Sequence, residues 1–199
     1  MLPCWKTRGW LEGAELEAAK TRPVRNYTLL EEVIRYRPIQ SLFENSRKEL
    51  EREIEIFAAP ASSLPLGFDA RTFSVMNGNI QIFIRAAVNK QTAIKVLIQE
   101  LANISIVEEV KRLYQSAREG GIDAEHFVEK IETLEFNASQ IYESTLRQLI
   151  KENRVIWRSF PHAHATFQQY KDVQKASGHS KLYFDVWDRL HKNYANPGQ

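Results

Sequence analysis

The chain has 199 residues, of which 43% are hydrophobic and 26% charged, with 8 glycines and 7 prolines. This composition is typical of a globular protein and excludes collagen-like, low-complexity and wholly disordered chains. Because 27 basic side chains are balanced by 25 acidic ones, the net charge of +2 gives no indication of a polyanionic partner.

Residues 1–60 are predicted to form an N-terminal helical segment. A short helix is expected over 28–36, and it should end before Pro38, which lacks the amide hydrogen needed to continue a helix. A longer helix is expected over 41–58, where apolar residues recur near a period of 3.6. Prolines, serines and a glycine in 58–67 then predict a loop or linker.

The segment after this loop carries the β signal of the chain. Apolar residues alternate on both sides of Asn77-Gly78, at Phe73, Val75, Ile80, Ile82 and Ile84. Asn-Gly between two alternating runs is a strong hairpin signal, because both residues tolerate a positive φ. We therefore expect 73–76 to pair with 79–84.

Helices are predicted for the rest of the chain, over 90–103, 106–118, 123–153, 163–176 and 181–193. Five apolar residues should be almost fully buried: Leu97, Leu101, Ile131, Leu134 and Ile141. The predicted fold class is α+β, predominantly α-helical with one small β-hairpin or sheet. The expected organisation is the segment 1–60 followed by a main domain over 68–199, or one continuous domain.

Several kinds of site are excluded by residue spacing. His162 and His164 lie two residues apart, which is not the i, i+4 spacing of a helical zinc site, so no metal site is predicted. Cys4, the single cysteine, lies in the terminal segment and gives no Cys–His nucleophile pair. No glycine-rich phosphate loop occurs, and the segment at Gly178-His179 lacks the spacing of a nucleophile elbow. No cofactor is expected.

The apolar hairpin FSVMNGNIQIFI is followed by a basic connection and the helix TAIKVLIQELANI. This order of elements resembles zincin metallopeptidases, in which a strand leads into a helix with the motif H-E-x-x-H. Aligned on Glu100, the resemblance places Gln99 and Asn103 at the two histidine positions. It covers residues 68–140 and implies Glu100 as general base, with Glu135 at the position of a third, acidic ligand.

The chain departs from the zincin motif at both histidine positions. Zinc prefers imidazole nitrogens, and neutral amides are poor ligands for it. The resemblance therefore implies a zincin-like scaffold without ordinary zinc hydrolysis. An alternative stays open, in which Lys95, Gln99 and Asn103 form a solvated helix face opposite the apolar residues.

The segment 167–187 resembles the ends of domains found at the C-termini of bacterial polymorphic toxins and secreted effectors. The pattern consists of Phe167, Tyr170, Gln174, Ser177, Gly178, His179, Tyr183 and Trp187. No particular activity follows from it. Gly178 is also explained as a left-handed helix C-cap, and His179 either caps the next helix or donates into a cleft.

These observations favour a bacterial effector- or toxin-type domain. The predicted catalytic residues are Glu100 as base, Asn103 as polarising donor, Glu135 as orienting acid and His179 as proton carrier. The alternative is a non-enzymatic helical module that binds a protein partner. A third hypothesis is nucleic-acid binding through the basic, aromatic region 151–199, but aromatic residues at helical spacing more often belong to a core. A protein partner or substrate is therefore expected, and nucleic acid is not favoured.

The cellular location is predicted from what the sequence lacks. No run of about 18 apolar residues occurs, as a membrane helix requires, so no membrane association is expected. The first residues, MLPCWKTRGW, lack the apolar core of a signal peptide. We expect a cytoplasmic protein, or one delivered by a secretion system that does not depend on a signal peptide.

Overall fold

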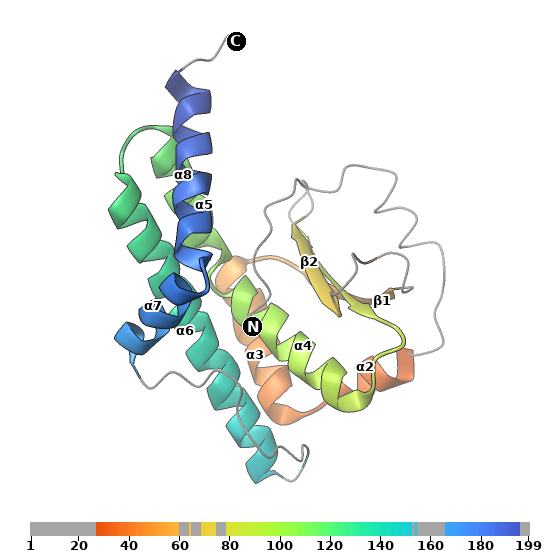
Figure 1. Ribbon diagram of the computed structural model, residues 1–199. Helices are drawn as coiled ribbons and strands as arrows, with labels where there is room; N and C mark the ends of the chain where they lie inside the picture. Colours follow the sequence, from red (N-terminus) through yellow and green to blue (C-terminus); the bar gives the residue numbers. More distant parts are fainter. Residues whose placement is uncertain are drawn as a thin grey trace. The chain divides into compact units, whose positions relative to one another are not determined.

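The computed structural model describes residues 27–59, 64, 69–74, 79–152, 154 and 166–195. The elements are α2 (Tyr27–Ile34), α3 (Arg37–Leu50), β1 (Ile54–Ala59), β2 (Ala70–Ser74), β3 (Ile80–Arg85), α4 (Lys90–Ile104), α5 (Val107–Arg118), α6 (Ala124–Lys151), α7 (Phe167–Ala176) and α8 (His179–Ala195) (Figure 1). The fold class is α+β and mostly helical with one small sheet, as the sequence predicts. None of the helices in these ranges is long and apolar enough to cross a membrane.

The chain divides into two compact units. The first unit consists of Met1–Ser105 with Tyr142–Ser159, and the second consists of Ile106–Ile141 with Phe160–Gln199. The loop predicted within 58–67 does not separate two domains, because β1 before it pairs with β3 after it in the same sheet.

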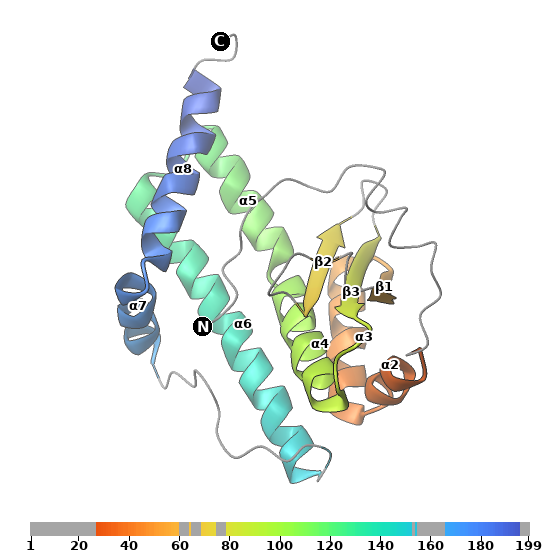
Figure 2. The same ribbon diagram turned by 45° about the vertical axis from the view of Figure 1, so that its right-hand side comes forward.

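The sheet of the first unit has the strand order β1-β3-β2, with β1 parallel and β2 antiparallel to β3 (Figure 2). In the antiparallel pair, Phe73 is opposite Gln81 and Ser74 is opposite Ile80. The two segments pair as predicted, but the register differs by one residue from the one that a two-residue turn at Asn77-Gly78 would give, in which Ser74 would be opposite Gln81. Phe73 therefore shares a face of the sheet with Gln81 and not with Ile82, and β2 begins at Ala70, before the predicted strand. The Asn77-Gly78 turn itself lies outside the described residues.

The helix predicted over 41–58 is wrong in its second half. The helix α3 ends at Leu50, and Glu51 adopts a left-handed conformation with φ of 51°. The chain then continues as β1, in which Ile54 pairs with Ile80. Pairing with an isoleucine-rich central strand outweighs the helix-like spacing, because β-branched residues pack well on a half-buried sheet.

Pro38 also has a different role from the one expected. It lies in the first turn of α3, which begins at Arg37. Proline is tolerated there because the amide groups of the first turn have no partner within the helix. The residue that was expected only to end one helix therefore also begins the next.

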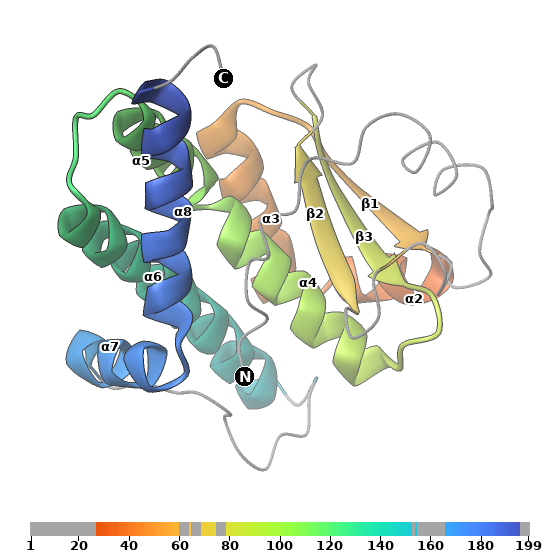
Figure 3. The ribbon, with the colours of Figure 1, turned by 45° about the horizontal axis from the view of Figure 1, so that its top comes forward.

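The core of the first unit lies between the sheet and the helices α2, α3 and α4. Figure 3 shows α3 and α4 side by side next to the strands. Leu97 and Leu101 of α4 have no exposed surface, which confirms their predicted burial, and Ile82 of β3 is equally buried. On the other face of the sheet, the rings of Phe57 and Phe83 stack with their centroids 5.1 Å apart.

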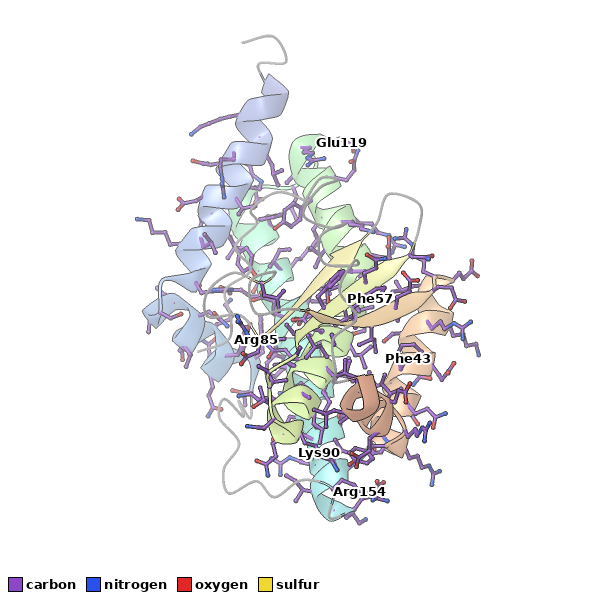
Figure 4. All side chains as sticks on the ribbon, turned by 90° about the vertical axis from the view of Figure 1, so that its right-hand side faces the viewer. Phe43, Phe57, Arg85, Lys90, Glu119 and Arg154 are labelled. Carbon is purple, nitrogen blue, oxygen red and sulfur yellow. The ribbon has the colours of Figure 1, made fainter. Side chains whose placement is uncertain are left out.

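The end of α6 belongs to the first unit. Arg154, which follows that helix, lies with its Cζ atom 5.3 Å from the ring centroid of Tyr36. Lys90, the first residue of α4, lies with its Nζ atom 5.3 Å from the same ring and forms an ion pair with Glu32. Lys90 and Arg154 are both labelled in Figure 4. These cation–π contacts connect the start of α4 and the residue after α6 to Tyr36, the N-cap residue of α3.

The core of the second unit is formed by α5, α6 and α8. Its buried members are Ala117, Phe127, Val128, Ile131, Tyr183 and Val186. Ile131 is 1% exposed, as predicted. The prediction of almost complete burial is wrong for Leu134 and Ile141, which are only partly buried. At this level of α6 a buried position is occupied by a polar side chain, that of Glu132.

Candidate functional site

A buried cluster of polar side chains forms around Glu135, where α6 meets α7 and α8. The hydroxyl of Tyr170 donates to Glu135 Oε2 over 3.0 Å, and the hydroxyl of Tyr183 donates to Oε1. The ring nitrogen Nε2 of His179 lies 3.3 Å from Oε2. One carboxylate therefore joins side chains from three helices.

This cluster is almost completely removed from water. Tyr170 has no exposed surface, and the side chains of His179 and Glu135 are 10% and 11% exposed. A carboxylate in such surroundings is stable only when hydrogen-bond donors replace its water shell. Glu135 meets this requirement, because the two tyrosine hydroxyls donate to different oxygens of the carboxylate.

A second carboxylate lies one turn earlier on α6. Glu132 is 2% exposed and accepts a hydrogen bond from the hydroxyl of Ser180 at the start of α8. Burial raises the pKa of Glu132, and the hydrogen bond from Ser180 opposes this rise only in part. The i, i+3 spacing of Glu132 and Glu135 places both acids on the same side of the helix.

The turn between α7 and α8 positions the donors of this cluster. Gly178 has a φ of +76°, a conformation that glycine adopts without the strain of a side chain. The residues directly after it, His179 and Ser180, then begin α8. One turn further along α8, the ring of Tyr183 meets that of His179 edge-on, with centroids 4.9 Å apart.

The tyrosines of the site are held in their neutral form. Burial raises the pKa of Tyr170 and of Tyr183 far above the usual value, and the negative charge of Glu135 adds to the effect. Burial also raises the pKa of Tyr114, a neighbour on α5, to about 12. Both hydroxyls that donate to Glu135 therefore keep their protons at any physiological pH.

The structure brings together two of the four residues predicted to be catalytic, Glu135 and His179. The other two, Glu100 and Asn103, lie on α4 in the first unit. There the hydroxyl of Thr72 donates to Glu100 Oε2 over 2.5 Å. Glu100 and Asn103 are both partly buried, as is Gln99, so this side of α4 is not a fully solvated face.

Sequence reasoning missed the roles of Glu132 and Ser180, and it named Tyr170 and Tyr183 only as parts of a pattern. The signal that could have found them is the combination of helical spacings. Tyr170 and Gln174 are four residues apart on α7 and both buried, and Gln174 hydrogen-bonds the Tyr170 hydroxyl. Polar residues at i, i+4 on a short helix indicate a polar partner across the interface.

Two described aromatic residues of the C-terminal region, Tyr170 and Tyr183, are too deeply buried to serve as a base-stacking platform, and the polar end of Trp187 is engaged as well. Tyr170 and Tyr183 are 0% and 2% exposed, and the indole nitrogen of Trp187 donates to the backbone oxygen of Ile122 over 3.0 Å. A ring that stacks on a nucleic-acid base must present one face to solvent. These rings belong to the core of the second unit.

Within the described ranges, no group of three or more His, Cys, Asp or Glu side chains is placed to hold a metal ion. His162 and His164 lie outside those ranges. In comparisons with known proteins, no protein-family model matches the sequence, and no curated protein or solved structure matches the chain.

We expect the purified protein to contain no stoichiometric zinc, and a chelator to leave its melting temperature unchanged. The amides of Gln99 and Asn103 stand where the zincin motif has imidazoles, and structural zinc would contribute to folding. The double variant Gln99→His with Asn103→His should bind zinc more tightly than either single variant, because it places two imidazoles at i, i+4 on one helix face. Metal analysis and zinc titration would measure this, and one zinc per unmodified chain would contradict it.

Proposed function

We propose that the chain is a bacterial effector- or toxin-type domain whose second unit carries an acid–base site formed by Glu135 and His179. The observation that supports this most directly is the 3.3 Å contact between His179 Nε2 and Glu135 Oε2. Both residues are among those predicted from the sequence, and His179 belongs to the pattern that resembles toxin and effector domains. Tyr170, Gln174 and Tyr183 of the same pattern are buried in the same unit.

The chemistry of the proposed site follows from its hydrogen bonds. A carboxylate fixed by two tyrosine hydroxyls is a rigid acceptor, and it orients the imidazole of His179. Because Nε2 is engaged with Glu135 and Tyr183, Nδ1 is the ring nitrogen left to exchange a proton with a substrate. Glu135 is thus the orienting acid, and His179 carries the proton.

The zincin-like part of the proposal concerns the first unit. The order of a strand followed by α4 supports it, and the replacement of both histidines by amides means that ordinary zinc hydrolysis is not proposed. In the first unit the proposed base is Glu100, and the proposed polarising donor is Asn103. The hydrogen bond from Thr72 fixes the carboxylate of Glu100 against β2.

We expect expression of the wild-type chain to slow the growth of bacterial or eukaryotic cells, and His179→Ala to restore it. Removing the imidazole removes the proton carrier but leaves Glu135 with both tyrosine donors. Growth rates at equal protein levels are the measurement, with Glu100→Ala tested in parallel. His126→Ala is the matched control, since His126 is an exposed histidine of the same unit and should stay as active as the wild type.

A second candidate function is binding of a protein partner without catalysis. The observation in its favour is the exposure of two large apolar side chains, Val173 on α7 at 47% and Phe184 on α8 at 38%. The growth experiment distinguishes this function from the acid–base site. A double variant, Val173→Ser with Phe184→Ser, would then lose the effect on cells while His179→Ala retained it. That result would refute the acid–base proposal.

A further inference from the structure

Two kinds of contact hold α7 and α8 in the second unit. The helix α7 and the start of α8 contact α6 through polar groups, whereas the rest of α8 packs through apolar side chains. The later part of α8 packs in the apolar core of the second unit through Val186. By contrast, Ser180 and Tyr183 bond carboxylates of α6, and α7 is held through the Tyr170 hydroxyl and the ring of Phe136. Carboxylates of α6 are therefore the hydrogen-bond acceptors for α7 and for the start of α8, beside the ring contacts.

Glu132 is the buried acid in this arrangement that lacks a cationic partner. Its hydrogen-bond donor in the described structure is the neutral hydroxyl of Ser180. Lys171 of α7 is the nearby cation, but its Nζ atom pairs with Glu129 at 3.1 Å. The titratable and polar groups around Glu132 and Glu135 come from three other helices: Tyr170 and Lys171 from α7, His179, Ser180 and Tyr183 from α8, and Tyr114, near Glu135, from α5.

We propose that the Glu132 carboxyl is a proton-dependent latch, which holds α7 and the first turn of α8 against α6 when protonated and loosens them when ionised. An ionised Glu132 would be a second negative charge one turn from Glu135, at a position that is only 2% exposed. Opening of α7 returns the carboxylate to water and relieves this cost. The latch concerns the stability of the unit, so it does not depend on the proposed activity.

The direction of the pH effect follows from the pKa of Glu132. Burial raises this pKa above the ordinary value of 4.5 in the closed state, whereas opening restores it. The closed state therefore takes up a proton. The extra stability of the closed state is fully present at a pH below the ordinary pKa of a glutamate. It is lost as the pH rises through the raised pKa that Glu132 has in the closed state. Each unit of pKa difference between the two states changes the opening equilibrium by about tenfold.

Hydrogen exchange of the full chain tests the latch, with protection factors corrected for the intrinsic effect of pH. Between about pH 5 and about pH 8, protection of amides in 168–182 should fall several-fold, whereas protection in 186–192 should change little. Glu132→Gln, which cannot ionise, should abolish the dependence in 168–182 and give high protection at both values. Ser180→Ala, which removes the donor to the ionised form, should increase the dependence.

The exposed acid Glu125 provides the matched control on the same helix. Glu125→Gln should leave the pH dependence as in the wild type, because the side chain of Glu125 is exposed and is not among the groups that act on Glu132. Equal protection of 168–182 at both pH values in the wild type would overturn the proposal. So would a full pH dependence that persists in Glu132→Gln. If Glu132→Gln does not fold, an unchanged pH dependence in Ser180→Ala would overturn it instead.

Discussion

Replacing Leu101 by alanine should lower the free energy of unfolding by about 2–5 kcal/mol, the range for truncating a buried leucine. Leu101 has no exposed surface and lies in α4, which packs against β2 and β3. The variant loses the transfer free energy of the removed carbons and leaves a cavity that the surrounding side chains fill only in part. Because a domain is stable by about 5–15 kcal/mol, the loss should be evident as a lower denaturation midpoint.

Two control substitutions test whether the loss for Leu101→Ala reflects the burial of this side of α4. Gln91→Ala changes an exposed residue of the same helix and should alter the free energy of unfolding by less than about 0.5 kcal/mol. Leu134→Ala, at a partly buried position of α6, should cost less than Leu101→Ala. A loss below about 1 kcal/mol for Leu101→Ala would mean that the apolar side of α4 does not face the core.

Elements whose signals are local were predicted well from the sequence. The helix α4 combines a period of 3.6 with an asparagine cap, since the side chain of Asn89 accepts a hydrogen bond from the backbone nitrogen of Thr92. The antiparallel pairing of β2 with β3 was predicted from the Asn77-Gly78 signal, but its register was not, since Phe73 is opposite Gln81 and Thr72 is opposite Ile82. In each case the residues that decide the structure lie within a few positions of one another.

The strand β1 could not be predicted in the same way, because its partner is distant in the chain. Ile54 pairs with Ile80 across the whole of β2 and two connections. A parallel pair has no tight turn to mark it, and the sequence IEIFAA fits a helix end as well as a strand. The pairing of β1 with β3 determines that this segment is a strand and not a helix end. Such a pairing cannot be recognised from a local sequence pattern.

The candidate site was predicted only in part, because it too depends on contacts between residues distant in the chain. Glu135 and His179 were chosen for their chemical types, and they do meet. The donors that satisfy Glu135 come from α7 and α8, and their convergence depends on the turn at Gly178. Sequence spacing places residues on a helix face, but it does not say which faces of three helices meet. Only the structure shows that the tyrosines point at this carboxylate.

The second large effect is expected at Glu135 itself. Glu135→Ala leaves the hydroxyls of Tyr170 and Tyr183 without their acceptor, at positions that are 0% and 2% exposed. A buried donor without a partner costs about 1–3 kcal/mol, so the two together should lower the free energy of unfolding by about 2–6 kcal/mol. Glu135→Gln should cost less, because its amide oxygen still accepts one of the two hydrogen bonds.

A double-mutant cycle separates this loss from a general effect of truncation. In Glu135→Ala combined with Tyr170→Phe, one orphaned hydroxyl is absent, so the loss should be smaller than the sum of the single losses by about 0.5–3 kcal/mol. Glu129→Ala is the control on the same helix. Its side chain is 55% exposed in an ion pair with Lys171, and such pairs contribute at most about 1 kcal/mol. Residues in one hydrogen-bond network do not behave independently, so the losses in the cycle should not simply add. Strict additivity would show that Glu135 is not the shared acceptor that joins the three helices. An equal loss of unfolding free energy for Glu129→Ala and Glu135→Ala would show the same.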